Sequence, residues 1–421
     1  MSERIMIITT SGGGGLLQAA VIQEERLRKK DPKVAIFKRD IMKDWFGKRF
    51  GSMGTGWWNA SQTKGNVFFQ VLLLKGQFIC EFLFVPKVFL KSFFLLKKEN
   101  IDRVIDTQQM LTSTIIKSIR FYNWLYNKNV TYEKVMIDLP THRAEHFFLP
   151  IRRCRKKERE LIKFVTLFPL LKDGQTEKEF WQKYCKLSLK NVHYDSYMVR
   201  QSFIPFENKE PSKDVCEIKI SFKSKEEKNT IEQVILKGFI QAKEKADHFI
   251  FSIDPKVKVV TALLGTYPSE KGLVEYMQSL VAFAKKSSEE TIFFAYCSHF
   301  DSRKSTLFQD LCEKICKIKD YPKNLTIVPF SLQPQETIAS LFYRSNTTIS
   351  RAGGGTAMEL MSVVKGDILI HSETYDKNAS REKLLKGIPG HESGAAEYLE
   401  EKVKARVVNP ELFLSYLKTS Y

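Results

Sequence analysis

The sequence has few cysteines and no long uninterrupted apolar run. Lysine and glutamate residues interrupt its most apolar stretch, residues 67–98, so we expect no helix with the roughly 20 apolar residues that span a bilayer. Of the seven cysteines, only Cys312 and Cys316 are close together, and their spacing is not that of a zinc site. The odd cysteine count and the short apolar run at the start predict a cytoplasmic protein, or one peripheral to a membrane.

The sequence is long, rich in apolar residues and strongly basic. Its 421 residues, 43% apolar and 12% aromatic, predict two or three globular domains with ordinary cores. The formal net charge of +19 predicts attraction to an acidic partner, whether anionic lipid, nucleic acid or a nucleotide. Because no nucleic-acid-binding motif is recognised, we expect no nucleic-acid partner.

The stretch from Thr347 to Val363 carries the strongest local pattern. An apolar, β-branched run ends at Ser350, glycines follow at Gly353, Gly354 and Gly355, and a helix is predicted from Thr356. The glycines would let a ligand approach the backbone, and the free N–H groups of the helix start would suit a diphosphate. Glu359, one turn inside, could accept hydrogen bonds from ribose hydroxyls. An ordinary strand-to-helix turn is the alternative.

Part of this stretch resembles a known signature: Ser350, Arg351, Ala352 and Gly353, followed by Thr356 and Glu359. The signature is that of glycosyltransferase family 28, which contains MurG and the plant and bacterial diacylglycerol galactosyltransferases. The resemblance implies an α/β fold of the GT-B type, with two Rossmann-like doubly wound domains facing across a cleft and a UDP-sugar held by the C-terminal domain. The chain has no Asp-x-Asp pair, so we expect no obligatory metal and no cofactor beyond the UDP-sugar co-substrate.

A second strand, glycine loop and helix opens the chain. Ile5–Thr10 predicts a strand, and a helix should follow the glycine run. A dinucleotide-binding fingerprint is the alternative, but its later acidic residue is missing. The resemblance implies that this loop, formed by Gly12, Gly13, Gly14 and Gly15, faces the acceptor and the reacting sugar. Where the family has a histidine linked to the catalytic base, this chain has Leu16, which cannot take a proton. Either another segment supplies the base or transfer is weak or absent.

Candidates for that base follow two further predicted strands, Asp102–Met110 running into a polar turn and Val135–Leu139. Ligands collect at the carboxyl ends of parallel strands. We therefore expect the cleft to receive the side chains of Asp106, Asp138, Thr141, His142 and His146. His142 is our first candidate for the base, with Asp138 as the second catalytic group. A surface position for His142 is the alternative.

Two stretches of the N-terminal half suggest a membrane surface. Residues 67–98 predict either buried helices of the core or an apolar face that dips into a bilayer with lysines at the headgroups. The densest basic run consists of Arg152, Arg153, Arg155, Lys156 and Lys157. It predicts either a solvated helix face or a site for anionic lipid.

We place the domain boundary in the polar segment 206–213. The expected domains are 1–210, which faces the acceptor or membrane, and 211–408, which binds the nucleotide sugar. A C-terminal helix, 409–421, could pack back on the N-terminal domain. The charged segment 221–249 has a helical pattern.

The resemblance implies a role for three further segments of the C-terminal half. The first strand of that domain, Lys256–Leu264, ends at Gly265 and Thr266, which would touch the nucleotide or its phosphates. The turn Phe330–Ser331 would contact the base through its backbone. His391, Glu392 and Ser393 stand where these families grip the sugar hydroxyls.

Three functions remain open from the sequence. The first is an inverting UDP-sugar glycosyltransferase with a lipid acceptor at a membrane surface. The second is a nucleotide-sugar-binding protein without transferase activity that binds a partner, an alternative that Leu16 supports. The third is a glycosyltransferase that modifies a protein.

Overall fold

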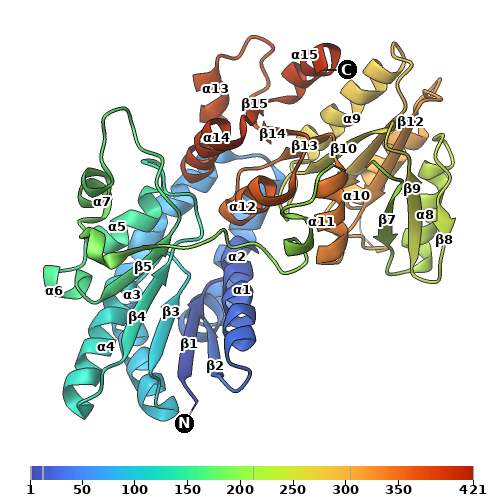
Figure 1. Ribbon diagram of the computed structural model, residues 1–421. Helices are drawn as coiled ribbons and strands as arrows, with labels where there is room; N and C mark the ends of the chain where they lie inside the picture. Colours follow the sequence, from blue (N-terminus) through green and yellow to red (C-terminus); the bar gives the residue numbers. More distant parts are fainter. Residues whose placement is uncertain (1, 12–13, 212, 304, 421) are drawn as a thin grey trace.

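The structure is a computed structural model that describes residues 2–11, 14–211, 213–303 and 305–420. Two six-stranded parallel sheets form two Rossmann-like domains, and a small antiparallel sheet flanks the second. Figure 1 shows the N-terminal domain at the lower left and the C-terminal domain at the upper right. The predicted fold class, α/β with two doubly wound domains, is confirmed.

The sheet of the N-terminal domain has the order β2-β1-β3-β4-β5-β6. Its strands are β1 Arg4–Thr9, β2 Ala35–Asp40, β3 Arg103–Asp106, β4 Thr131–Val135, β5 Ile162–Thr166 and β6 Val192–Tyr194. The helical segments are α1 Gly14–Lys30, η1 Ile41–Phe46, α2 Lys48–Thr63, α3 Val67–Glu99, α4 Thr112–Tyr126, α5 Glu145–Arg152, α6 Lys156–Arg159, α7 Glu177–Cys185, η2 Leu189–Asn191 and η3 Ile204–Phe206. Successive core residues of β1 are fully buried because helices cover parallel sheets on both faces.

The larger sheet of the C-terminal domain has the order β12-β11-β10-β13-β14-β15, in which the order reverses between β10 and β13. Its strands are β10 Lys258–Leu263, β11 Thr291–Tyr296, β12 Leu325–Phe330, β13 Thr347–Ser350, β14 Asp367–His371 and β15 Arg406–Val408. The helices are α8 Lys225–Ile235, α9 Glu270–Ala284, α10 Leu307–Cys316, α11 Gln335–Arg344, α12 Gly354–Val363, α13 Arg381–Lys386, α14 Gly390–Val403 and α15 Pro410–Ser420. The small sheet contains β7 Cys216–Ser221, β8 Lys243–Glu244 and β9 His248–Ile253.

Three expectations about elements are wrong. The predicted strand Val135–Leu139 lies too late in the chain, because β4 ends at Val135 and the following residues form the loop to α5. The segment 221–249 is helical only within α8, and its end belongs to the small antiparallel sheet. The C-terminal helix α15 packs on α9 rather than on the N-terminal domain, and Tyr416 donates a hydrogen bond to Asp367.

The chain crosses between the domains before the predicted boundary. The first large sheet ends at Tyr194, yet the backbone N–H of Met198 already contacts Met358 of α12. Phe203 packs edge-on against Phe342 of α11. The chain from about residue 198 therefore contacts the C-terminal domain, although Met198 also accepts a hydrogen bond from Gln23 of α1.

Candidate functional site between the domains

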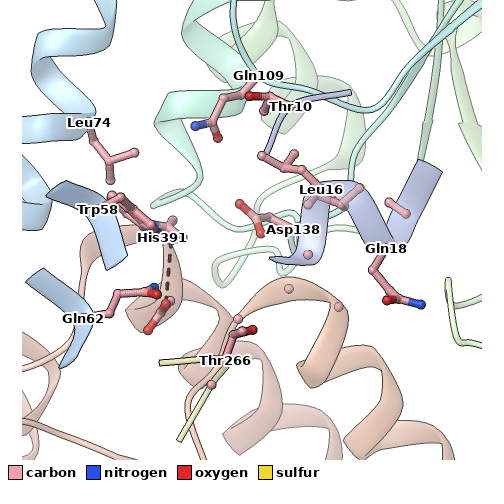
Figure 2. Close-up of a pocket in the computed structure, with 18 of the residues that line it drawn as sticks. Thr10, Leu16, Gln18, Trp58, Gln62, Leu74, Gln109, Asp138, Thr266 and His391 are labelled. Atoms are coloured by element: carbon pink, nitrogen blue, oxygen red, sulfur yellow. Dashed lines mark ion pairs between the residues drawn. The ribbon is translucent and has the colours of Figure 1, made fainter. Parts of the chain in front are cut away.

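A cleft of about 1080 Å³ lies between the two domains. Residues that follow β1, β3 and β4 form its N-terminal wall, and residues that follow β10 and β13 form its C-terminal wall. Figure 2 shows Thr10, Gln109 and Asp138 of the first wall and Thr266 and His391 of the second around this space. Both sheets thus present the carboxyl ends of their strands to one cavity, which is where open α/β sheets bind ligands.

The C-terminal wall is built at the point where the strand order reverses. β10 and β13 are neighbours, with Leu263 opposite Ser350, and the hydroxyl of Ser350 donates to the carbonyl of Leu263 at 2.9 Å. Gly265 follows with a φ of +82°, a conformation that glycine adopts without strain. The turn brings Gly265 and Thr266 into the cleft beside the loop after β13.

The start of α12 offers backbone donors to the cleft. Its N-cap, Gly353, has no side-chain hydrogen bond to the helix, so the first N–H groups depend on another partner. Gly353, Gly355 and Thr356 line the cleft, and a Cβ atom at Gly353 or Gly355 would meet nothing within 4 Å. There is room for an anion close to the backbone.

Gly354 is where the two walls touch. A Cβ atom there would lie 2.3 Å from the carbonyl oxygen of Ile137 and 2.5 Å from Oδ1 of Asp138. Only a residue without a side chain allows this approach. The start of α12 is thereby held directly against the loop after β4.

Glu359 of α12 is occupied by an arginine from the interdomain segment. Arg200 donates to both carboxylate oxygens, with Nη2 at 2.7 Å from Oε2, and Glu359 is buried. Burial raises the pKa of Glu359 above its ordinary value in spite of the arginine. The pair fixes Glu359 at the edge of the cleft, which both residues line.

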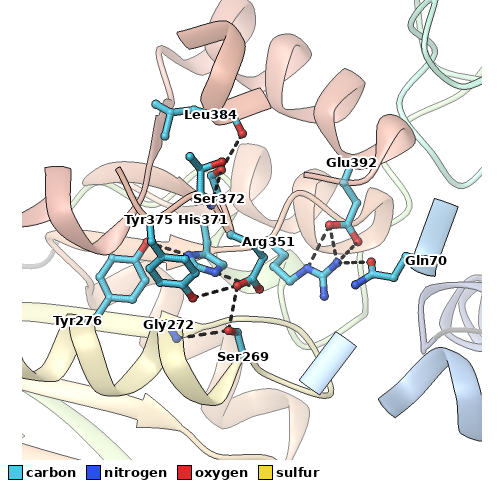
Figure 3. A network of polar contacts seen from close by, with 12 residues as sticks. Gln70, Ser269, Gly272, Tyr276, Arg351, His371, Ser372, Tyr375, Leu384 and Glu392 are labelled. Atoms are coloured by element: carbon cyan, nitrogen blue, oxygen red, sulfur yellow. Dashed lines mark hydrogen bonds and ion pairs between the residues drawn. The ribbon is translucent and has the colours of Figure 1, made fainter. Parts of the chain in front are cut away.

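Arg351 and Glu392 form a second buried pair on the same wall, shown in Figure 3. The guanidinium donates through Nε and Nη2 to the carboxylate of Glu392 at 2.9 to 3.1 Å. Nη2 also donates to Oε1 of Gln70 at 3.2 Å, and Gln70 lies on α3. The C-terminal wall is therefore bonded to the N-terminal domain.

Behind Arg351, a buried network fills the space between β14 and α9 (Figure 3). Nε2 of His371 lies 3.2 Å from Glu373, which also accepts hydrogen bonds from Ser269 at 3.0 Å and Tyr375 at 3.1 Å. Burial would raise the pKa of Glu373, but the charge and hydrogen bond of His371, the charge of Arg351 and the hydrogen bond from Ser269 outweigh it and hold the pKa at about 2. A Cβ atom at Gly65 would lie 2.6 Å from Glu373. The turn between α2 and α3 therefore packs directly against this network.

Two histidines and an aspartate meet where the walls converge. Nε2 of His146 lies 2.7 Å from Oδ2 of Asp138, and the rings of His146 and His391 are 4.8 Å apart between centroids. Burial alone would raise the pKa of Asp138, but the hydrogen bond from His146 and the charges of His146 and His391 outweigh it, so this pKa lies below its ordinary value. Burial lowers the pKa of His391, which favours its neutral form.

No protein-family model matches the chain, and no curated protein matches it. Solved structures with a similar fold include MurG of Acinetobacter baumannii, 12% identical, with 99% of this chain and 90% of that chain covered and a TM-score of 0.46. They also include the rhamnosyltransferase SpnG, 10% identical, covered 99% and 100%, TM-score 0.43. A UDP-GlcNAc 2-epimerase of Neisseria meningitidis bound to UDP-GlcNAc is 10% identical, covered 99% and 99%, TM-score 0.42. These likenesses concern overall form, and function has to be argued from the cleft itself.

Many of the residues singled out in the sequence do line the cleft. They are Gly15, Leu16, Asp138, Gly265, Thr266, Arg351, Gly353, Gly354, Gly355, Thr356, Glu359, His391 and Glu392. Gly14 is the first residue of α1, while Gly12 and Gly13 lie outside the described residues.

Other residues predicted for the site are buried behind the walls of the cleft. Ser350, Ala352, Phe330, Ser331 and Ser393 are buried, and the hydroxyl of Ser331 is bonded to Glu227. Leu332 and Gln333, just after the turn, reach the cleft instead.

His142, in the loop before α5, does not line the cleft, whereas His146, on α5, does. His142 is half-buried, and burial lowers its pKa. Asp106 is fully buried and paired with Lys134 at 3.0 Å, so it belongs to the core.

Sequence reasoning missed Arg200 and Gln70. Arg200 is an isolated arginine in the interdomain segment, and Gln70 stands within an apolar stretch, so no local pattern marks either. Among the described residues, no group of three or more His, Cys, Asp and Glu side chains is placed to hold a metal ion.

Proposed function

We propose that the protein is an inverting glycosyltransferase that moves a sugar from a UDP-sugar to an acceptor hydroxyl. The observation that carries the proposal is the cleft itself, which joins the start of α12, a helix without a side-chain cap, to Gly265 and Thr266 at the point where the strand order reverses. A diphosphate is the ligand that such an arrangement suits.

Each part of the donor has a candidate partner. The amides from Gly353 to Thr356, with Thr266, would hold the diphosphate and stabilise the charge that grows on it as the sugar leaves. Glu359 would accept the ribose hydroxyls while keeping Arg200, since a carboxylate can accept about four hydrogen bonds. Glu392 and His391 would face the sugar, because both line the same wall.

The apolar side of the cleft favours a lipid acceptor. Met53 and Trp57 of α2 and Leu72, Ile79 and Leu83 of α3 line the cleft, and each of them is also exposed. The apolar lining therefore continues onto the outer surface, as expected for an acceptor that remains partly in a bilayer.

Positive charge accompanies this apolar surface. Arg153 of the basic run lies 3.9 Å from Glu81 of α3, which brings the run beside the apolar helix and suits an anionic membrane surface. Among the described helices, none is both long and apolar enough to cross a membrane.

Two alternatives remain, and Leu16, which lines the cleft where a histidine would be expected, supports the first of them. One is a nucleotide-sugar-binding protein without transfer chemistry that acts through a partner. The other is a transferase with a protein acceptor.

The test is release of UDP from a panel of UDP-sugars, with and without vesicles that contain anionic lipid and diacylglycerol. We expect turnover with one donor that rises at least about tenfold with vesicles, because the acceptor would be presented there. Tight UDP binding without turnover in any condition would favour the binding protein. Turnover that requires added protein and ignores vesicles would favour the protein acceptor.

A further inference from the structure

We propose that His146 is the general base of the transfer and that Asp138 positions it, an inference that rests on the proposed function. Asp138 follows β4, and His146 is the second residue of α5. Both line the cleft, so the pair stands on the N-terminal wall, where the acceptor would arrive.

The hydrogen bonding of His146 suits a base. Its Nε2 is 2.7 Å from Oδ2 of Asp138, which makes Nε2 the nitrogen that carries the proton. Among the described residues Nδ1 has no hydrogen-bond partner, so it is the nitrogen with a free lone pair. The side chain keeps 10% of its surface exposed, in contact with the cavity.

Asp138 is a poor base but a good partner for one. Because its pKa lies below the ordinary value, it stays ionised near pH 7. Its charge holds the tautomer of His146 and stabilises the imidazolium that forms when His146 accepts a proton, the same division of labour as in a Ser-His-Asp triad.

The charged groups around the pair leave His146 able to accept that proton. His391 of α14 faces it with a ring held neutral by burial. Beyond His391, Nε2 of that ring is 4.0 Å from Glu392, whose charge is matched by Arg351. No second positive charge therefore stands directly against His146 among these groups.

The pair is also close to the place proposed for the diphosphate. Asp138 touches the backbone at Gly354, the first residue of α12, whose amide groups would hold the leaving group. An acceptor hydroxyl beside His146 would then lie next to the sugar attached to that diphosphate. Leu16 lines the same cleft and fills, with an apolar side chain, the position of the histidine that the family would place there.

The chemical step balances without any further reactant. The acceptor oxygen forms a bond to the anomeric carbon as its proton passes to Nδ1 of His146. The bond from the anomeric carbon to the diphosphate breaks, and its electron pair leaves on UDP. The proton is later released to water when product departs.

Three variants separate this inference from its competitors. His146→Gln should lower kcat about 10²- to 10⁴-fold, the usual contribution of a positioned base, while UDP affinity changes less than about threefold. Asp138→Asn should lower kcat at least about tenfold, since it removes the charge that stabilises the imidazolium. His142→Gln tests the base favoured by sequence, and we expect kcat within about twofold of the wild type. His193→Gln, at an exposed position of β6, is the matched control.

A pH profile distinguishes a base from a structural residue. A general base acts only in its unprotonated form, so the wild type should lose kcat/KM at acidic pH, and His146→Gln should lose that limb. Thermal unfolding of each variant shows whether it is folded.

The inference is overturned if His146→Gln is folded and keeps kcat and the acidic limb, or if His142→Gln loses as much activity as we expect of His146→Gln. If the wild type transfers sugar in either case, the proposed function stands and only the base is wrong. If the wild type binds UDP but transfers to no acceptor, both the base and the transferase are wrong.

Discussion

At the scale of single residues, buried charges are what hold the C-terminal wall in shape. Arg351 with Glu392 and Arg200 with Glu359 are both more than four-fifths buried as side chains. Taking such charges out of water is costly, and removing one partner leaves the other unpaired, which typically costs 3–5 kcal/mol. These pairs are therefore better understood as fixing the positions of cleft residues than as a source of net stability.

Glu373 makes the free energy of unfolding depend on pH. Its pKa is about 2 in the folded protein and 4.5 as the reference value, so the unfolded chain binds more protons between these limits. Its contribution is complete above about pH 4.5 and is lost as pH falls toward 2. We predict that the free energy of unfolding falls by about 2 kcal/mol more between pH 5 and pH 3 in the wild type than in Glu373→Gln.

Urea unfolding at the two pH values measures the difference. Equal pH dependence in the two proteins would contradict the buried pairing of Glu373.

The sequence could indicate which residues follow the strands but not which of them meet. Glu359 and Thr356 were predicted from their spacing after a glycine turn, and both line the cleft. The arginine that binds Glu359 is 159 positions away in the chain, and no local pattern encodes such a contact. His142 lies in the loop before α5 and His146 lies on α5. Only the tertiary fold shows which of the two side chains reaches the cleft.

At the scale of elements, α3 is the least ordinary part of the molecule. Its C-terminal half packs into the domain through Val88, Phe93 and Leu96. Its N-terminal half carries Phe68 and Phe82, which are 79% and 82% exposed and are separated by 14 positions, so they share a face. The interpretation of residues 67–98 as buried core thus holds for the second half of the helix, and a membrane role of the first half stays a prediction.

We predict that the double variant Phe68→Ser, Phe82→Ser weakens binding to anionic vesicles at least about tenfold. Burying one phenylalanine is worth about 1.5–3 kcal/mol, and each tenfold change in affinity corresponds to about 1.4 kcal/mol. Co-sedimentation with vesicles measures the change.

Leu236→Ser is the matched control, because Leu236 is 76% exposed but lies at the end of α8 in the C-terminal domain. Equal loss in the control, or none in the double variant, would contradict a membrane role for α3.

Elements with a strong local pattern were predictable, and those defined by their partners were not. The apolar, β-branched run predicted to end at Ser350 is observed as β13, which ends at that residue and is buried along its whole length. β8 and β9 were missed, because their pairing with each other and with β7 outweighs the helical charge pattern of the segment. The position of β4 was misjudged because the apolar residues after Val135 are buried in a loop rather than in the sheet.

At the scale of the whole molecule, the two domains touch through α12 and α14. Besides Gly354 on Asp138, Gly394 lies against Thr141, where a Cβ atom would be 2.2 Å from the hydroxyl oxygen. Arg143 spans the same junction with two hydrogen bonds to Glu397 of α14, at 2.9 and 3.0 Å. The approach of the domains sets the width of the cleft.

A single added methyl group tests this junction. Gly354→Ala would place Cβ 2.3 Å from a backbone oxygen of the other domain, so we expect the domains to separate, with a loss of about 1–3 kcal/mol in stability and a larger radius of gyration by small-angle scattering. Gly355→Ala adds the same group in open space and should be neutral or stabilising by up to about 1 kcal/mol. If the two variants behave alike, the close contact at Gly354 does not hold the domains together.

The most direct test of the central claim is a crystal structure of the protein with UDP. The account predicts diphosphate oxygens at about 3 Å, hydrogen-bonding distance, from the amide nitrogens between Gly353 and Thr356, with the ribose beside Glu359. A diphosphate bound elsewhere, or a cleft that stays empty at saturating UDP, would contradict it.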